Sequence, residues 1–168
     1  MAESLWIAID EHLCTTFDDA LRYTETYPVQ TVIATAIQSV RDWETWPLPA
    51  LAVVGVRVRR APGGHGGPTG TLGGQVQLGL HYDKEMTYRI VAIGEGKQTD
   101  ATLFAKTLEK RIEATLRGLS WAGVVADDGE VIRQWSVDGS DIAVFPKPRA
   151  DNTWYGLAIV SLTVRTHI

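Results

Sequence analysis

The sequence lacks several features that would place it in a specialised class. Cys14 is the single cysteine of 168 residues, so no intrachain disulfide can form and the chain is not a secreted disulfide scaffold. No apolar run approaches the length of a membrane-spanning helix, so we expect no membrane partner. The N-terminal stretch carries Glu3, Asp10 and Glu11 and no lysine or arginine, unlike a signal peptide. We therefore expect a protein that works or assembles inside a cell.

The chain also lacks a surplus of basic charge. Its 16 lysines and arginines against 20 acidic residues give a formal net charge of -4, which argues against a dedicated nucleic-acid binder. Hydrophobic content of 45% and charged content of 21% are ordinary for a soluble globular protein. The length suits one domain, so we expect residues 1–168 to form a single domain with a substantial core.

The centre of the chain pairs a strand with an amphipathic helix. Met86–Ile93 reads as a strand, which we expect Gly94 and Gly96 to end. Asp100 is then the predicted N-cap of a helix over Ala101–Arg117. The predicted apolar stripe of this helix comprises Phe104, Leu108, Ile112, Thr115 and Leu119. The predicted charged face comprises Lys106, Glu109, Lys110, Glu113 and Arg117, and we expect Glu113 and Arg117 to form an ion pair. Gly118 is predicted to end the helix.

The N-terminal third favours helices. Apolar residues at helical spacing predict a helix over Glu3–Leu13, and a second piece over Asp18–Thr26 that ends before Pro28. Val29–Trp43 carries a wide apolar stripe that fits a third helix. Its β-branched residues leave a strand over Val29–Ile37 as the alternative.

A long hairpin is predicted next. Leu51–Arg60 and Gln75–Tyr82 alternate apolar and polar residues, and we expect them to pair with Pro62–Gly74 as a flexible tip. On the first strand the expected apolar face comprises Ala52, Val54, Val56 and Val58, and the expected polar face Gly55, Arg57 and Arg59.

The C-terminal third reads as strands. Turn-forming residues at Asp127–Gly129 and Asp138–Gly139 predict a small three-stranded meander inserted over Trp121–Phe145. Trp154–Thr166 is the longest strand candidate, and we place it mid-sheet under the central helix. The expected fold is α+β: a mostly antiparallel sheet with helices packed on one side, a glycine-rich hairpin arm and the meander.

No catalytic or cofactor-binding pattern rises above background. The glycine-rich segment Pro62–Gly74 differs from a phosphate loop in two ways. No Lys-Ser or Lys-Thr follows it, and the next predicted element is a strand, not a helix. His81 and His167 fall on polar strand faces without a Cys or carboxylate at metal-ligand spacing. No serine can be paired with a histidine from sequence, and the paired acidic residues fit caps and turns. We expect no enzyme activity, catalytic residue, metal or cofactor.

The remaining candidates are interface residues at the periphery. Arg57, Arg59 and Arg60 end a strand beside the glycine segment, where they fit either a charged edge that resists aggregation or a contact with an acidic neighbour or passing DNA. Six tryptophans are many for this length, and tryptophan is favoured in interfaces. The other candidates are Gly64, His65 and Gly66 in the glycine segment, and Trp46 and Trp135 near expected loops.

Taken whole, the chain resembles the tail terminator and tail-completion (neck) proteins of long-tailed bacteriophages. The resemblance is one of elements: an N-terminal helical portion, the strand Leu51–Arg60, a long hairpin tip, the strand Met86–Ile93, the helix Ala101–Leu119 and the closing strand Trp154–Thr166.

The resemblance implies a virion structural protein, assembled in the host cytoplasm, that forms a homo-oligomeric ring, typically a hexamer. One ring face would cap the tail tube and the other would dock on the head–tail connector, with DNA passing through the channel without specific binding. Alternatives are another neck component (a head-completion or stopper protein), a bacterial interaction module of similar fold, and a small enzyme or ligand-binding domain. This last would have a pocket between helix and sheet and a polar cluster of His81, Arg89 and His167.

Overall fold

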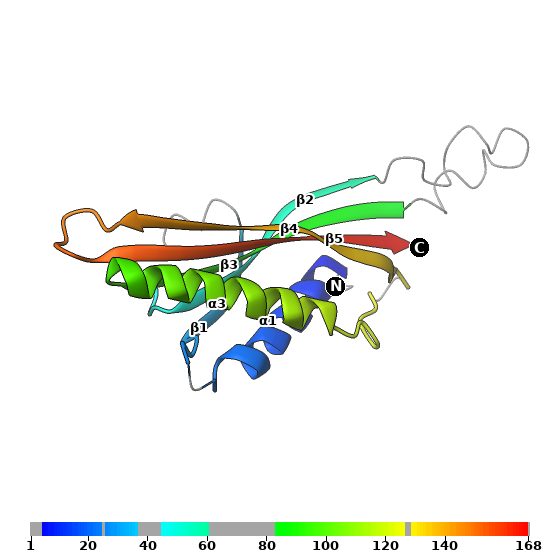
Figure 1. The fold of residues 1–168 in the computed structure, drawn as a ribbon. Coiled ribbons are helices and arrows are strands. Elements are labelled where there is room, and N and C mark those ends of the chain that lie inside the picture. The colour runs from blue at the N-terminus through cyan, green and yellow to red at the C-terminus, as the bar shows by residue number, and fades with distance from the viewer. Residues whose placement is uncertain (1–4, 25, 37–44, 61–82, 127–128, 168) are drawn as a thin grey trace, which may run out of the picture.

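In the part of the chain that the structure describes, the fold is a five-stranded sheet with two helices on one face (Figure 1). A computed structural model describes residues 5–24, 26–36, 45–60, 83–126 and 129–167. The elements are α1 (Leu5–Leu21), β1 (Thr31–Ala36), β2 (Ala50–Arg60), β3 (Asp83–Gly96), α3 (Gln98–Arg117), β4 (Val131–Pro146) and β5 (Trp154–His167). The strand order is β1-β2-β3-β5-β4, with β1 parallel to β2 and every other pair antiparallel. The predicted α+β class is confirmed.

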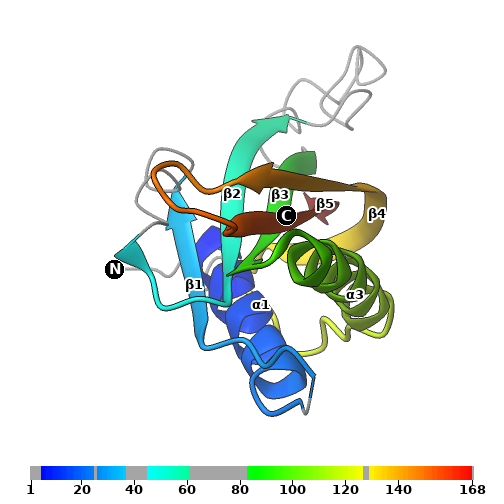
Figure 2. The ribbon, with the colours of Figure 1, turned by 60° about the vertical axis from the view of Figure 1, so that its left-hand side comes forward.

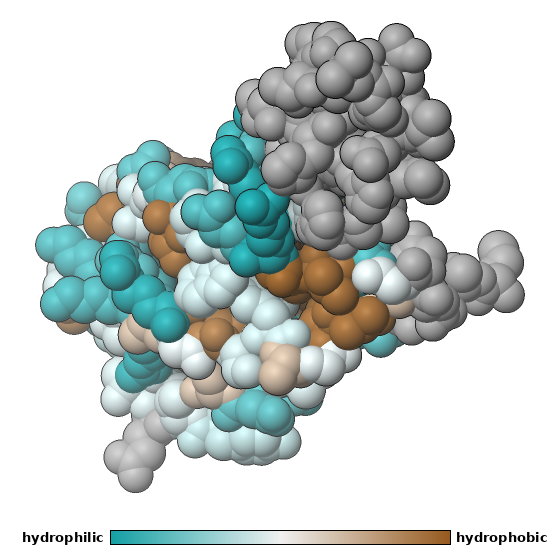
Figure 3. Space-filling model, turned by 90° about the vertical axis from the view of Figure 1, so that its right-hand side faces the viewer, coloured by the Kyte–Doolittle hydropathy of each residue, from teal (hydrophilic) through white to brown (hydrophobic). Residues whose placement is uncertain are grey.

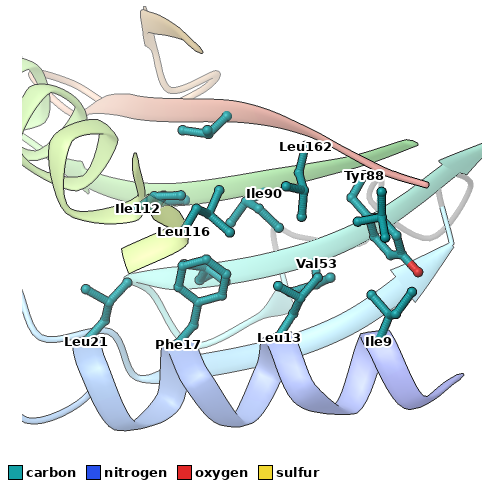
Figure 4. Close-up of a cluster of buried hydrophobic side chains, with 14 of the residues drawn as sticks. Ile9, Leu13, Phe17, Leu21, Val53, Tyr88, Ile90, Ile112, Leu116 and Leu162 are labelled. Atoms are coloured by element: carbon teal, nitrogen blue, oxygen red, sulfur yellow. The ribbon is translucent and has the colours of Figure 1, made fainter. Parts of the chain in front are cut away.

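The main core lies between the sheet and both helices (Figures 2 and 4). Side chains of α1 point towards β2 and β3, and side chains of α3 meet them from the other end of the same face. Burying each large apolar side chain stabilises the fold by about 1.5–3 kcal/mol relative to exposure. The largest fully buried side chains are Tyr88, Phe17, Leu5, Ile9, Leu13, Leu51, Ile90, Ile93, Leu108, Ile112, Leu116 and Leu162.

The N-terminal helix is continuous, so the prediction of two separate pieces was wrong. Buried residues recur at every fourth position from Leu5 to Leu21, which carries one apolar stripe through the expected break. The hydroxyl of Thr16 donates to the carbonyl of His12 at 2.7 Å, one helical turn earlier, where the break had been expected.

The segment after α1 forms an edge strand. Of the two alternatives for this segment, a helix and a strand, the structure supports the strand. Thr31–Ala36 pairs in parallel with Ala50–Gly55, and the dense β-branched residues favour this outcome. The helix over Val29–Trp43 is therefore wrong for 31–36, and 37–44 lie outside the described residues.

The strand at the centre of the sheet runs through both glycines that were expected to end it. β3 extends from Asp83 to Gly96, and Gly94 pairs with Gly156 of β5. A Cβ on Gly156 would lie 2.2 Å from the carbonyl oxygen of Ala101, and one on Gly94 would lie 2.7 Å from the Phe104 ring. These glycines therefore let the first turns of α3 approach the sheet closely.

The central helix starts earlier than predicted and ends where expected. It begins at Gln98 after Lys97, so Asp100 lies in the first turn and is not the N-cap. Gly118 is the C-cap, and the Glu113–Arg117 pair forms with a 2.6 Å contact. The buried stripe comprises Ala101, Phe104, Ala105, Leu108, Ile112 and Leu116, so Leu116 takes the place expected for Thr115.

A bulge in β2 changes which of its residues share a face. The register of pairing with β3 shifts between Gly55 and Arg57. Gly55 consequently faces the helices, where a Cβ would lie 1.9 Å from the Trp6 ring, while Arg57 and Arg59 face the opposite side. The predicted shared face for Gly55 and these arginines was wrong because alternation does not reveal an extra residue.

The predicted meander is instead one long edge strand. β4 spans Val131–Pro146 and pairs with β5 along its length, and Val125 makes only an isolated bridge to Val131. Asp138 lies at a register shift between Val137 and Gly139, so the expected turn is a bulge. The closing strand β5 lies between β3 and β4 under α3, as predicted. The expected partner strand Gln75–Tyr82 and the tip Pro62–Gly74 lie outside the described residues.

Candidate functional site

The face of the sheet that the helices leave uncovered has an apolar half and a polar half. In the apolar half, Ala52, Val54, Val91 and Ile93 are buried, and Trp46 packs against them together with Leu48, Val56, Leu157 and Ile159. The segment before β2 therefore covers this half. The polar half lies towards the other end of the strands and is the part with side chains available for chemistry.

Two rows of polar residues cross four strands in the polar half. The pairing registers place Glu85 between Arg59 and Arg165, and place Thr87 between Arg57 and Thr163. β4 completes the rows with Gln134 beside Arg165 and Ser136 beside Thr163. Neighbours in a row have Cβ atoms about 5 Å apart, so these side chains lie within reach of one another.

Glu85 is the centre of an ion-pair network. Its Oε1 accepts from Nη2 and Nε of Arg59 at 2.7 and 3.0 Å, and its Oε2 accepts from Nε of Arg165 at 3.3 Å. The Glu85 side chain is 8% exposed, whereas those of Arg59 and Arg165 are 44% and 45% exposed. The hydrogen bonds from Arg59 outweigh the effect of burial and hold the pKa of Glu85 below its usual value.

A second, smaller network lies on the β4 side. Asp138 accepts a hydrogen bond from the Ser136 hydroxyl at 2.8 Å and another from the Thr163 hydroxyl. The bulge at Asp138 positions its carboxylate beside the second polar row. The polar half thus has a cationic side on β2 and β5 and an anionic side on β4.

These residues surround an open cleft of about 500 Å³. Three arginines face two carboxylates in its wall, which leaves one positive charge in excess on a chain whose net charge is -4. Arg57 is exposed and makes no ion pair with any described residue. Seen from the end of the sheet where β5 finishes, a hydrophilic band lies beside a hydrophobic patch (Figure 3). The lining residues are Arg57, Arg59, Glu85, Thr87, Gln134, Trp135, Ser136, Asp138, Thr163 and Arg165.

The structure brings together only some of the predicted interface residues. Arg57 and Arg59 both line the cleft, and Arg60 ends β2, although its side chain is outside the description. Gly64, His65 and Gly66 also lie outside the described residues. Trp135 also lines the cleft, and it packs against the main core with its ring 6.3 Å from that of Trp121. Trp46 lies apart from them and covers the apolar half.

Of the residues that line the cleft, only Arg57, Arg59 and Trp135 were predicted as interface residues. The predicted turn at Asp138–Gly139 kept Asp138 off a sheet face, and Glu85 lies just before the predicted strand Met86–Ile93. Arg165 lies in the predicted closing strand, but the sequence assigns it no neighbour. The pairing of β3 with both β2 and β5 is what unites Glu85 with the two arginines. The sequence did hold one signal for this network, namely the arginines at alternate positions of β2. A carboxylate that is nearly buried on the same face of the sheet needs such cations beside it.

Of the polar cluster expected with a pocket between helix and sheet, only the Arg89 side chain is described, and it does not lie between helix and sheet. Arg89 lies on the uncovered face beside Ser161, and His81 and the His167 side chain lie outside the description. On the helix side, the Asp10 carboxyl lies near the hydroxyl of Tyr88. Burial raises the pKa of Asp10 to about 6, against a smaller lowering by Tyr88.

The described residues hold no group of three or more His, Cys, Asp or Glu side chains placed to bind a metal ion. Among the helices in these residues, none is long and apolar enough to cross a bilayer. No family model matches the chain, and no match is found among curated proteins.

Proposed function

We propose that the protein is a structural subunit of a bacteriophage tail or neck, similar to the tail terminators, and that it has no catalytic role. In this proposal copies close into a ring, one face of which caps the tail tube while the other docks on the head–tail connector. DNA would pass through the ring without specific binding.

The observation that carries the proposal is the order and placement of the elements. An N-terminal helix, the paired strands β2 and β3, a helix across the sheet and a closing strand that lies between β3 and β4 occur in the order that the resemblance implies (Figure 1). Gly94 and Gly156 let α3 pack closely on β3 and β5, which supports the reading of this helix and sheet as the scaffold of a structural subunit.

The surfaces also suit a head-to-tail contact. A ring requires two different, complementary patches on each subunit. The described residues offer two unlike edge strands, the short parallel β1 and the long β4, and two unlike faces, one helical and one carrying the polar cleft. These unlike surfaces could supply the two patches of a heterologous, ring-closing contact.

Light scattering on a sizing column tests the ring, and reconstitution with purified tail tubes tests the cap. Addition of the protein to growing tubes should stop their elongation, and electron micrographs should show a ring at one tube end. Unchanged tube length distributions, with no protein at the tips, would exclude tube capping and leave another neck component as the alternative.

A further inference from the structure

The arginines of the cleft have hydrogen-bond donors left over after they pair with Glu85. A guanidinium has five N–H groups. Arg59 donates from Nε and Nη2 to Oε1, whereas Arg165 donates from Nε to Oε2 and has its Nη2 in ion-pair contact with the same oxygen. The two N–H groups on each Nη1 therefore have no partner among the described residues. Since both side chains are nearly half exposed, these donors are accessible from the cleft.

Arg57 adds a third guanidinium, which makes no ion pair with any described residue. It lies two residues from Arg59 on β2, on the same face, and is exposed at the cleft wall. A β-strand rises about 3.3 Å per residue, so the two side chains leave the strand about 7 Å apart. An anion seated between them can accept from both arginines at once, which is the geometry that binds a planar carboxylate well.

The carboxylates of the cleft decide which kind of anion fits. A nucleic-acid backbone presents a series of phosphates and needs several basic side chains without acidic neighbours. Here Glu85 and Asp138 lie among the arginines, and would repel any phosphate beyond the first. A polypeptide instead offers isolated carboxylates together with backbone N–H groups, and Asp138 can accept hydrogen bonds from those.

We propose that this cleft is a docking site for an acidic segment of a partner protein, with a carboxylate of the segment held by Arg57 and by the free Nη1 groups of Arg59 and Arg165. Glu85 orients the two paired arginines and at the same time competes for them. The site then binds weakly and reversibly, as suits a contact made and adjusted during assembly. This inference does not require the ring.

The test measures binding of a defined peptide to the full chain. A fluorescein-labelled hexapeptide, Gly-Ser-Glu-Glu-Gly-Ser, is titrated with protein to about 1 mM, the range of weak contacts. The control peptide carries Gln in place of both Glu residues. We expect saturable binding of the first peptide and none of the second, with affinity falling as salt rises from 50 to 300 mM, because exposed charges are screened.

Three variants separate the site from general electrostatics. Arg57→Gln should weaken binding about tenfold, the usual loss for one charge-assisted hydrogen-bonded contact. Glu85→Gln should tighten it by about threefold because the internal competitor is gone. Lys106→Gln removes an exposed cation from α3, on the other side of the sheet, and should change nothing. Arg57 makes no ion pair with a described residue, so its variant should unfold at the wild-type temperature.

Three results would overturn the inference. The first is equal affinity for the Glu and Gln peptides, and the second is an equal loss of peptide affinity in the Arg57 and Lys106 variants. The third is that a 12-base-pair DNA duplex binds more tightly than the Glu peptide and that Arg57→Gln abolishes this DNA binding. The last would assign the cleft to nucleic acid. The ring is measured separately as oligomer mass, so failure of peptide binding with an intact ring, or the reverse, distinguishes the two proposals.

Discussion

Arg59 donates two hydrogen bonds, at 2.7 and 3.0 Å, to one carboxylate oxygen of Glu85 on the neighbouring strand. The bulge at Val56 makes this possible, because without the extra residue Arg59 would face the helices. Glu85 is nearly buried and would be costly without a cation beside it. The network is therefore part of the fold as well as of the cleft.

Replacing Arg59 should weaken the fold in a pH-dependent way. Arg59→Gln removes the main cause of the lowered Glu85 pKa, and we expect a loss of about 1 kcal/mol at pH 7, since the arginine is nearly half exposed and Arg165 remains. A depressed carboxyl pKa stabilises the fold above the unfolded value of about 4.5. Urea unfolding should therefore show wild type and variant converging below pH 4, with Lys106→Gln matching wild type throughout.

Replacing Asp10 should have the opposite pH dependence. Its pKa is raised to about 6 in the fold, so the folded protein holds the proton more tightly than the unfolded chain does. Stability should consequently decline as the pH rises from 4 through 6. Asp10→Asn should remove this decline and raise stability at pH 8 by about 1 kcal/mol, a value reduced for the partial exposure of Asp10.

Thermal unfolding at pH 5 and pH 8 checks the Asp10 prediction. The exposed neighbour Glu11 supplies the matched control as Glu11→Gln. A pH profile that Asp10→Asn leaves unchanged would show that Asp10 titrates alike in folded and unfolded chains.

Alanine substitutions at three glycines should rank by the space available. A Cβ at Gly156 meets the backbone of Ala101 at 2.2 Å, one at Gly94 meets the movable Phe104 ring at 2.7 Å, and one at Gly96 lies 3.3 Å from Asp100. We expect Gly156→Ala to cost about 3 kcal/mol, Gly94→Ala about half of that and Gly96→Ala less than about 1 kcal/mol. Denaturant midpoints measure the order, and equal costs would contradict the close contact of α3 with β5.

The elements that sequence predicted well are those whose periodicity is local. The stripe of Phe104, Leu108 and Ile112 and the alternation of β5 follow from spacing alone. Gly94 was mistaken for a strand end because the reason for it, the ring of Phe104, lies ten residues away and across a layer. Likewise Asp138 was read as a turn, since a bulge and a turn draw on the same residue types.

The cleft depends on non-local pairing, which explains why Arg57, Arg59 and Trp135 were the only residues of its lining that were predicted as interface residues. Arg57 and Arg59 were visible as a cluster within one strand. Glu85 and Arg165 join them only once β3 is placed between β2 and β5, a strand order that one sequence does not reveal.

The ring proposal meets its most direct test in the mass of the protein in solution. Size-exclusion chromatography with light scattering, on the full chain at high concentration, should give a closed oligomer, for a hexamer about 110 kDa or six times the 18.4 kDa of one chain. A strict monomer at every concentration, which also fails to join tail tubes, would contradict the account.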